Sequence, residues 1–443
     1  MVLREHKHED FYIKVDNRWI LVDEKLLSSH PGGSAMLTYK NLDATTVFHT
    51  FHANSKPAYK MLKDVFVEQE GKVEVPQDLL KIKEDHLVPG VDDVNMGQYN
   101  LTEEEVQKMC KSFDQLRFKV RQAGLLNGNT SFFARKFCEA VLLIGLALSL
   151  QYNTYYVCSA LCMGLAWQQL GWMIHEYCHH QHFKDHDWND GMSYIVGNLM
   201  QGFSSGGGRS SIMSTMLLLM LSAETVTWTC FPLGHKDGES LLIYLIPFQH
   251  LYWTLALPLL RLSWLVQSIV FVSQMQNNFY EIYRRRAKVE QLTLAMHWSL
   301  VALQYYFLPN FQTRLMYFAI SQLFAGFLIG HVVTYNHYST DKFPHNAKIL
   351  ENYACLQLYT TRNMRSGIFI DWLWGGLNYQ IEHHLFPTMP RNNLKAVMPM
   401  IKEFCAENNL PYMVDDYFTG WKHEIEQFQK VARVASKLLK KST

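Results

Sequence analysis

The sequence has almost no net charge and no organised cysteine pattern. Its 41 Lys and Arg residues nearly balance 40 Asp and Glu residues, for a formal net charge of +1. No general attraction to nucleic acid or to acidic partners is therefore expected. Eight cysteines are scattered over 443 residues without a CxxC pair, which is typical of reduced, packing cysteines in a protein that faces the cytosol. The first ten residues, MVLREHKHED, are polar and charged, unlike a secretory signal peptide.

The apolar residues are collected in blocks. Hydrophobic residues make up 48% of the chain, and their blocks favour a membrane domain joined to soluble parts. Residues 137–152 and 156–174 predict one helical hairpin through the bilayer, and residues 292–308 and 315–335 predict a second. The sequence therefore predicts about four transmembrane helices in contact with the lipid bilayer.

The apolar stretch between the two hairpins has a different character. Residues 241–272 are interrupted by Pro247, Pro258 and Arg261, so we expect them to lie at the membrane interface rather than to cross it. The basic run Arg284–Arg286 places the loop before the third span on the cytosolic side.

The chain before the first hairpin reads as a small α+β unit and a linker. Residues 11–22 are rich in strand-forming residues with a turn at Asp16–Asn17, within a unit over residues 8–70. Residues 70–97 are charged and carry prolines, which indicates a linker. Thr102 and Glu105 have capping-box spacing and predict an amphipathic helix that runs to Gly124.

One motif in the N-terminal unit predicts a haem. The sequence HPGG at 30–33 is followed by DATTVFHTFH at 43–52. A low-spin haem b needs two facing imidazoles, and Gly32 and Gly33 would let the backbone approach the porphyrin edge. We expect His30 to be the first ligand and His52 the second, with His49 as the alternative. The competing interpretation is a pair of surface histidines beside a turn.

Two further histidine clusters predict a metal site that activates oxygen. In HEYCHH, His175 and His179 are four residues apart and share one helix face, while His180 could reach a second metal. In QIEHH, Gln380 and His383 are three apart, and His384 is adjacent. Imidazole ligands suit iron, and open positions on such an iron allow oxygen chemistry. Solvated histidines can show the same spacing, but two clusters at the cytosolic ends of spans, beside a haem donor, favour a metal pair.

Two other histidines have separate expectations. His337, just past the fourth span, is a candidate for an additional ligand. His297 lies within the third span, where we expect a packed, hydrogen-bonded side chain rather than a ligand.

These motifs resemble the membrane fatty acid desaturases. Residues 8–70 look like a cytochrome b5 domain, and the Gln380 form of the last box is similar to that of front-end desaturases. The resemblance implies a multidomain chain: a b5-like haem domain at 1–70, a linker and amphipathic helix at 71–125, and an α-helical integral membrane desaturase domain with a cytosolic cap at 126–443. It also implies a di-iron centre whose ligands are His175, His179, His180, His337, Gln380, His383 and His384.

The resemblance carries expectations about chemistry and partners. Front-end desaturases remove two hydrogens between an existing double bond and the carboxyl end, using O2. Here the electrons would come from the chain's own b5 haem, supplied by NADH-cytochrome b5 reductase. Stretches such as SHPGGSA and LPYMVDDYFTG are most similar to delta-5 members, with delta-6 members second. Acyl-CoA and phospholipid both remain open as carriers of the fatty acyl substrate.

The C-terminal residues bear on location. The sequence ends in KKST, which resembles a dilysine retrieval signal. We therefore expect a multi-pass protein of the endoplasmic reticulum membrane with its haem domain and active site in the cytosol.

The middle histidine box of the family, HxxHH, is absent. Family-like sequence runs to GNLMQGFSSGG and resumes near PFQHLYW, and residues 206–221 between them contain no histidine. If translation starts at the wobble base of the Gly207 codon, suitable synonymous codons read WKEQHNVHHAATNVVGRDGDLDL. We therefore hypothesise that residues 208–230 are an out-of-frame translation of the middle box and that the frame returns by about residue 244.

Two other functions stay open on sequence grounds. If residues 208–230 are genuine, the chain is a catalytically impaired, haem-binding membrane protein that serves in electron transfer or as a partner subunit. A membrane hydroxylase on the same iron scaffold is disfavoured by the b5 fusion and by Gln380.

Overall fold

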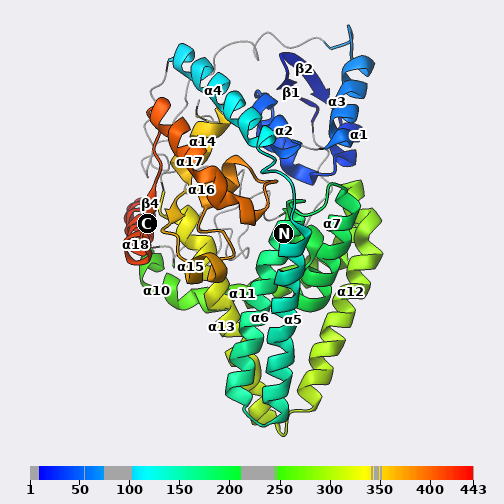
Figure 1. Cartoon of the computed structure of the whole chain (residues 1–443), viewed down its shortest axis with the longest axis vertical. Helices are drawn as coiled ribbons and strands as arrows, with labels where there is room; N and C mark the ends of the chain where they lie inside the picture. The colour runs from blue at the N-terminus through cyan, green and yellow to red at the C-terminus, as the bar shows by residue number, and fades with distance from the viewer. Residues whose placement is uncertain are drawn as a thin grey trace.

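The chain is mostly helical (Figure 1), and its described residues form two sheets of two strands each. The computed structural model describes residues 9–53, 55–73, 102–210, 247–340 and 352–442, together with Leu245, Phe343 and Ile349. Most of the predicted linker, and residues 211–230 of the hypothesised frame error, lie outside this part of the chain.

The N-terminal domain, defined here as the described residues 9–73, is an α+β unit as predicted. Strands β1 (Phe11–Val15) and β2 (Arg18–Val22) pair antiparallel. Asp16 and Asn17 both have positive φ angles (49° and 61°), which two-residue hairpin turns require. The remaining elements of the domain are short helices: α1 (Glu24–Ser29), η1 (Gly33–Tyr39), α2 (Thr45–Phe51) and α3 (Lys56–Glu68).

Helix α4 (Glu103–Gln122) begins where the sequence predicts. The Thr102 side chain accepts a hydrogen bond from the Glu105 amide, and the Glu105 carboxylate accepts one from the Thr102 amide. The helix packs against α17 (Arg391–Glu407) through Phe113, which is fully buried beside Phe386 and Phe404.

Four long helices run side by side below the cap (Figure 1). They are α5 (Thr130–Tyr152), α6 (Tyr156–Cys178), α12 (Glu281–Tyr306) and α13 (Phe311–Tyr338). Their far ends are joined by Gln304, which donates to Gln151 Oε1 (3.0 Å) and to the Tyr317 hydroxyl (2.8 Å). The two predicted hairpins therefore form one bundle.

The prediction of about four spans is supported only in part. Within the described residues, three helical segments are long and apolar enough to cross a membrane: Tyr156–Cys178, Gln249–Asn277 and Phe311–Tyr338. Two of them are α6 and α13. Helix α5 is not among them because its first half carries Arg135, Lys136 and Glu139, and α12 is not because polar side chains are spread along it.

The segment that was expected to lie at the interface is therefore itself a candidate span. It consists of α10 (Gln249–Ala256), η5 (Leu257–Leu259), α11 (Leu260–Gln274) and η6 (Met275–Asn277). Pro258 sits in the short turn η5, so the helix continues on either side of it. Arg261 is fully buried: it donates to Gln322 Oε1 (2.8 Å) and lies 4.3 Å from the Trp167 ring centre. Burial against polar and aromatic groups keeps this cation away from lipid.

Two short elements follow α6. They are α7 (His186–Ser193) and the π-helix η3 (Tyr194–Gln201), and Gly202 ends the latter in a left-handed conformation (φ 81°). The chain is helical again over residues 205–210.

The cap at the upper end of the bundle is built from the C-terminal fifth of the chain and α4 (Figure 1). Its helices are α14 (Tyr353–Thr360), α15 (Ile368–Leu373), α16 (Gln380–Leu385), α17 and α18 (Tyr417–Ser442). Strands β3 (Asn363–Met364) and β4 (Val414–Asp415) pair in parallel and join the chain before α16 to the chain before α18.

The N-terminal domain packs directly on the membrane domain. Its core residues share one apolar cluster with Val272, Met275, Tyr280 and Tyr283 of the α11–α12 region. On another side, Phe51 contacts the ring of Tyr353 in the cap (ring centres 6.2 Å apart). The structure thus places the predicted haem motif against the domain that carries the other histidines.

Candidate metal and haem sites

The two histidines predicted to bind haem face one another. The ring centres of His30 and His52 are 6.3 Å apart, which leaves room for one metal ion between two nitrogens, since metal–imidazole bonds are about 2 Å long. His52 uses Nδ1 to hydrogen-bond the Phe48 carbonyl (2.9 Å), so its Nε2 is left for a ligand. Burial, with His52 adding to it, lowers the pKa of His30 to about 4, which keeps this ring neutral, as a metal ligand must be.

The alternative second ligand, His49, is engaged elsewhere. Its Nδ1 lies 2.9 Å from the Tyr59 hydroxyl, and its Nε2 lies 2.8 Å from an Asp16 carboxylate oxygen. Of the two histidines considered from sequence, the structure therefore brings His52 to His30.

Both predicted glycines sit where a side chain would not fit. A Cβ on Gly32 would lie 2.7 Å from His30 Cε1, and a Cβ on Gly33 would lie 2.9 Å from the Tyr283 hydroxyl oxygen. Gly33 also has a positive φ of 61°. The HPGG loop therefore needs glycine both for its own histidine and for its contact with α12, and the residues present fit a haem held between His30 and His52.

The two distant histidine boxes converge between α6 and α16. The possible ligand nitrogens of His175, His179 and His383 all lie within 4.8 Å of one another. His175 and His179 come from the last turn of α6 and its end, and His383 comes from α16. These three side chains could hold one metal ion together, although they come from two segments about two hundred residues apart in the sequence.

A second group of predicted residues adjoins the first. The ring of His384 lies 4.9 Å from that of His337, at the end of α13, and 5.8 Å from that of His383. Gln380 Nε2 lies 3.0 Å from His337 Nε2, while Asn336 Nδ2 donates to Gln380 Oε1 (3.1 Å). The Gln380 amide thus contacts its neighbours rather than the His175 group.

The donor set fits a metal. Within the described residues, His179 Nε2 and His384 Nε2 are buried without a hydrogen-bond partner, a costly arrangement unless something else binds them. Burial, reinforced by neighbouring histidines, holds the pKa values of His179, His383 and His384 well below the usual value. Neutral imidazoles with free nitrogens are the form that binds iron.

His180 is the one predicted ligand that lies outside both groups. Its ring stacks on His186 (ring centres 4.1 Å apart, planes at 12°), and Arg209 donates to its Nε2 (2.8 Å). Arg209 also pairs with Asp190, as does Arg286. His180 therefore faces the segment that begins the hypothesised frame error.

Several supporting residues were missed from the sequence. Gln357 of α14 accepts a hydrogen bond from His384 Nδ1 (2.6 Å). Buried Glu382, between the box residues, accepts from Asn363 Nδ2 (2.7 Å) and from the Tyr412 hydroxyl (2.5 Å). No local spacing signals these contacts, because their partners lie 19 or more residues away along the chain.

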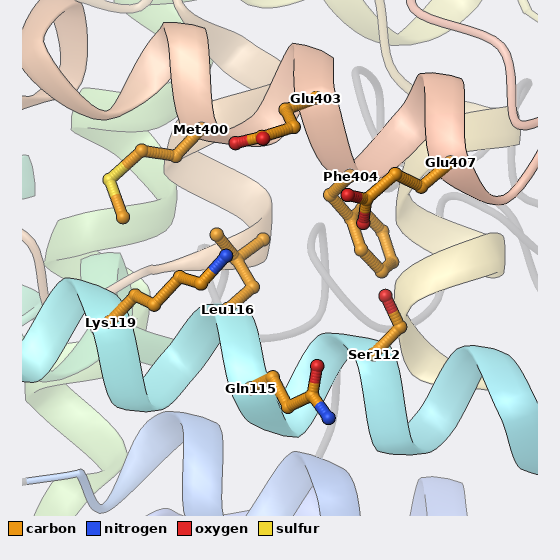
Figure 2. A pocket seen from close by; sticks show the side chains of 8 residues that line it. All are labelled: Ser112, Gln115, Leu116, Lys119, Met400, Glu403, Phe404 and Glu407. Atoms are coloured by element: carbon orange, nitrogen blue, oxygen red, sulfur yellow. The ribbon is translucent and has the colours of Figure 1, made fainter.

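A pocket between α4 and α17 is separate from both sites (Figure 2). Its lining consists of Ser112, Gln115, Leu116, Lys119, Met400, Glu403, Phe404 and Glu407. None of these residues is a histidine, and we assign this pocket no part in the chemistry.

Buried imidazoles that could hold a metal ion thus gather at the ends of long apolar helices. Residues 153–415 match the fatty acid desaturase family, and the chain belongs to that family.

Similar proteins extend over the whole chain. A delta(5) fatty acid desaturase of Caenorhabditis elegans is 52% identical over 100% of both chains. A delta(6)-fatty-acid desaturase of the same organism is 42% identical over 95% of this chain and 96% of its own. A delta(8)-fatty-acid desaturase of Euglena gracilis is 32% identical over 87% of this chain and 88% of its own.

Proposed function

We propose that this protein is a front-end fatty acyl desaturase that inserts a double bond at carbon 5. The observation that carries this proposal is the full-length similarity to a delta(5) desaturase, together with the convergence of His175, His179 and His383. Delta-6 activity is the second candidate, since the delta(6) relative is less similar.

We assign metal binding to the two groups of side chains described above. His175, His179 and His383 would hold one iron, and His337 and His384 a second, with Gln380 and His180 as further predicted ligands. Iron bound there would supply the oxidant derived from O2 that removes two hydrogens from the acyl chain. The protein's own contribution is to hold neutral imidazoles in place and to exclude water from them.

The N-terminal domain is assigned as the electron donor. A haem b between His30 and His52 would supply electrons singly, and the HPGG loop contacts Tyr283 of the membrane domain. NADH-cytochrome b5 reductase would reduce this haem from the cytosol. We place the protein in the endoplasmic reticulum membrane, with both sites on the cytosolic side and the fatty acyl substrate entering from the bilayer or as acyl-CoA.

The frame hypothesis belongs to this proposal. Two irons need about five or six donors each, more than the five histidines of the two groups provide. A middle box between Gly207 and residue 244 would supply three further histidines. The alternative, an impaired haem protein, is not favoured by the full-length desaturase similarity.

Two experiments test the proposal. The cloned messenger RNA is expected to encode Gly-Gly-Trp-Lys-Glu-Gln-His-Asn-Val-His-His from position 206 onward. Yeast expressing the chain with that segment, and fed a twenty-carbon acid unsaturated at carbon 8, should gain a double bond at carbon 5. Products unsaturated at carbon 6 would move the assignment to delta-6. A transcript that matches the printed sequence, with desaturase product from that exact chain, would overturn the frame hypothesis.

A further inference from the structure

Two buried residues of helix α12 contact residues 198–206, which precede the expected position of the middle box. Glu290 and His297 of α12 are seven residues apart and therefore lie on one face of the helix. Both are buried, and Glu290 is 0% exposed. Neither residue belongs to the histidine groups described above.

The Glu290 carboxylate is surrounded by donors from one segment. Its Oε2 accepts a hydrogen bond from the Ser204 hydroxyl (2.6 Å) and one from Asn198 Nδ2 (3.3 Å). Its Oε1 accepts one from the Gly206 amide (2.8 Å). A buried carboxylate is retained at low cost only where such donors satisfy it. All three donors lie between residues 198 and 206, before the point of the hypothesised frame error.

Two glycines allow this close approach. A Cβ on Gly206 would lie 2.9 Å from Glu290 Oε1, and a Cβ on Gly202 would lie 2.5 Å from His297 Nε2. His297 Nδ1 in turn lies 2.9 Å from the Leu199 carbonyl oxygen, which confirms the expectation of a packed, hydrogen-bonded histidine. The segment is therefore fitted to α12 at two points, about two helical turns apart.

The held segment leads toward the histidines of α6. A Cβ on Gly208 would lie 4.0 Å from both Cys178 Sγ and Ile174 Cδ1, so the backbone passes beside the last turn of α6. The next residue, Arg209, reaches His180 Nε2 (2.8 Å). Residues 208 and 209 therefore lie beside the HEYCHH box.

We propose that Glu290 is a positioning residue, whose hydrogen bonds to Asn198, Ser204 and Gly206 fix the path of residues 206–210 beside the HEYCHH box at the end of α6. This inference rests on the proposed function for its purpose, but the contacts exist in the chain as printed. Glu290 acts through the segment and touches neither the metal position nor the substrate.

The test compares Glu290→Gln with a matched control. Gln keeps the size of the side chain but replaces one acceptor oxygen with a donor. The Gly206 amide and Asn198 Nδ2, which only donate and face opposite oxygens, can then no longer both be satisfied. Glu424 on α18 is the control, because it is equally buried and accepts from Trp253 Nε1 (2.9 Å) without contacting residues 198–206. Ser204→Ala, which removes one donor and leaves the carboxylate, serves as a milder second variant.

Two readouts are taken on the full-length protein in lipid nanodiscs. In Glu290→Gln, amide hydrogen exchange over residues 198–210 should rise at least tenfold, with a smaller rise in Ser204→Ala and none in Glu424→Gln. In the chain with the middle box restored, Glu290→Gln should also lower non-haem iron affinity by about tenfold or more, while haem absorbance per protein stays unchanged.

The outcomes separate the inference from the proposed function. Unchanged exchange and iron affinity in Glu290→Gln, or equal changes in Glu424→Gln, would overturn the positioning role. If the restored parent binds no non-haem iron and makes no product, the proposed function fails, and hydrogen exchange alone still decides whether Glu290 holds the segment.

Discussion

One imidazole in each candidate site is oriented by a hydrogen bond to its Nδ1. His52 Nδ1 hydrogen-bonds the Phe48 carbonyl oxygen, and His384 Nδ1 hydrogen-bonds the Gln357 side-chain oxygen. In each ring the acceptor fixes the tautomer and leaves Nε2 with a lone pair. A backbone carbonyl cannot be removed by mutation, but Gln357 can.

The first prediction concerns the second haem ligand. In the full-length protein, His52→Ala should abolish the six-coordinate low-spin haem spectrum, because one axial nitrogen is lost. His49→Ala is the control and should keep that spectrum, since His49 is bonded to Tyr59 and Asp16. Absorption spectra of the oxidised and reduced proteins decide it, and the reverse pattern would assign His49 as the ligand.

The second prediction concerns Gln357. Replacement by Leu removes the acceptor of His384 Nδ1 and should weaken non-haem iron binding by about 10–100-fold, with the haem spectrum intact. Gln276, an exposed glutamine of η6, gives the matched variant Gln276→Leu, which should bind iron normally. Iron titration of the purified proteins measures the difference, and equal affinities would exclude a role for Gln357 in holding His384.

The individual histidines could be predicted from sequence because their signals are local. HPGG, HEYCHH and QIEHH each fall within six residues, and the structure brings members of each into a site. Gln357, Glu382 and Glu290 could not be predicted, because a buried polar residue has no local pattern and its partners lie far away in the chain. For His180 the spacing predicts the helix face but not the orientation of the ring. That orientation depends on contacts with Arg209 and His186.

At the scale of elements, the sequence signals for where helices and turns begin predicted the structure well, whereas the burial of residues could not be predicted. The capping box of α4 and the turn at Asp16–Asn17 lie where the sequence predicts them. The status of Gln249–Asn277 was missed because a buried Arg261 and a lipid-facing arginine look alike in sequence. The sequence likewise predicted α4 but not that its buried face packs against α17.

The third prediction tests that packing. Phe113 is fully buried on α4, whereas Phe118 on the same helix is 61% exposed. Phe113→Ala should destabilise the cap by about 3–5 kcal/mol through lost burial and a residual cavity, and Phe118→Ala should change stability by less than about 0.5 kcal/mol. Thermal unfolding followed by tryptophan fluorescence gives both values. Similar losses for the two variants would mean that α4 does not dock through this face.

At the scale of the whole molecule, the bundle separates the two ends of the membrane domain. Helix α6 has 23 residues and is roughly 35 Å long, enough to cross the hydrocarbon core of a bilayer. His175 lies near its end, while the turn to α5 lies at the other. The candidate metal site and that turn should therefore face opposite aqueous compartments.

The fourth prediction tests this sidedness by cysteine labelling. Tyr152, 89% exposed at the end of α5, replaced by Cys should react with a membrane-impermeant maleimide only after sealed microsomes are opened by detergent. Lys422 on α18, with a side chain 73% exposed, replaced by Cys should react before opening. Peptide mass spectrometry distinguishes these sites from the native cysteines. Labelling of both positions in sealed vesicles would contradict the bundle as a membrane span.

The shared apolar cluster between the N-terminal domain and the α11–α12 region has a consequence for protein engineering. Val272, Met275, Tyr280 and Tyr283 are buried in a cluster that residues 9–73 complete. A truncated chain would expose that surface to water, where such patches promote aggregation, and an N-terminal domain grafted from a distant relative would have to match its shape. Exchange of N-terminal domains between desaturases is thus a problem of fitting two surfaces.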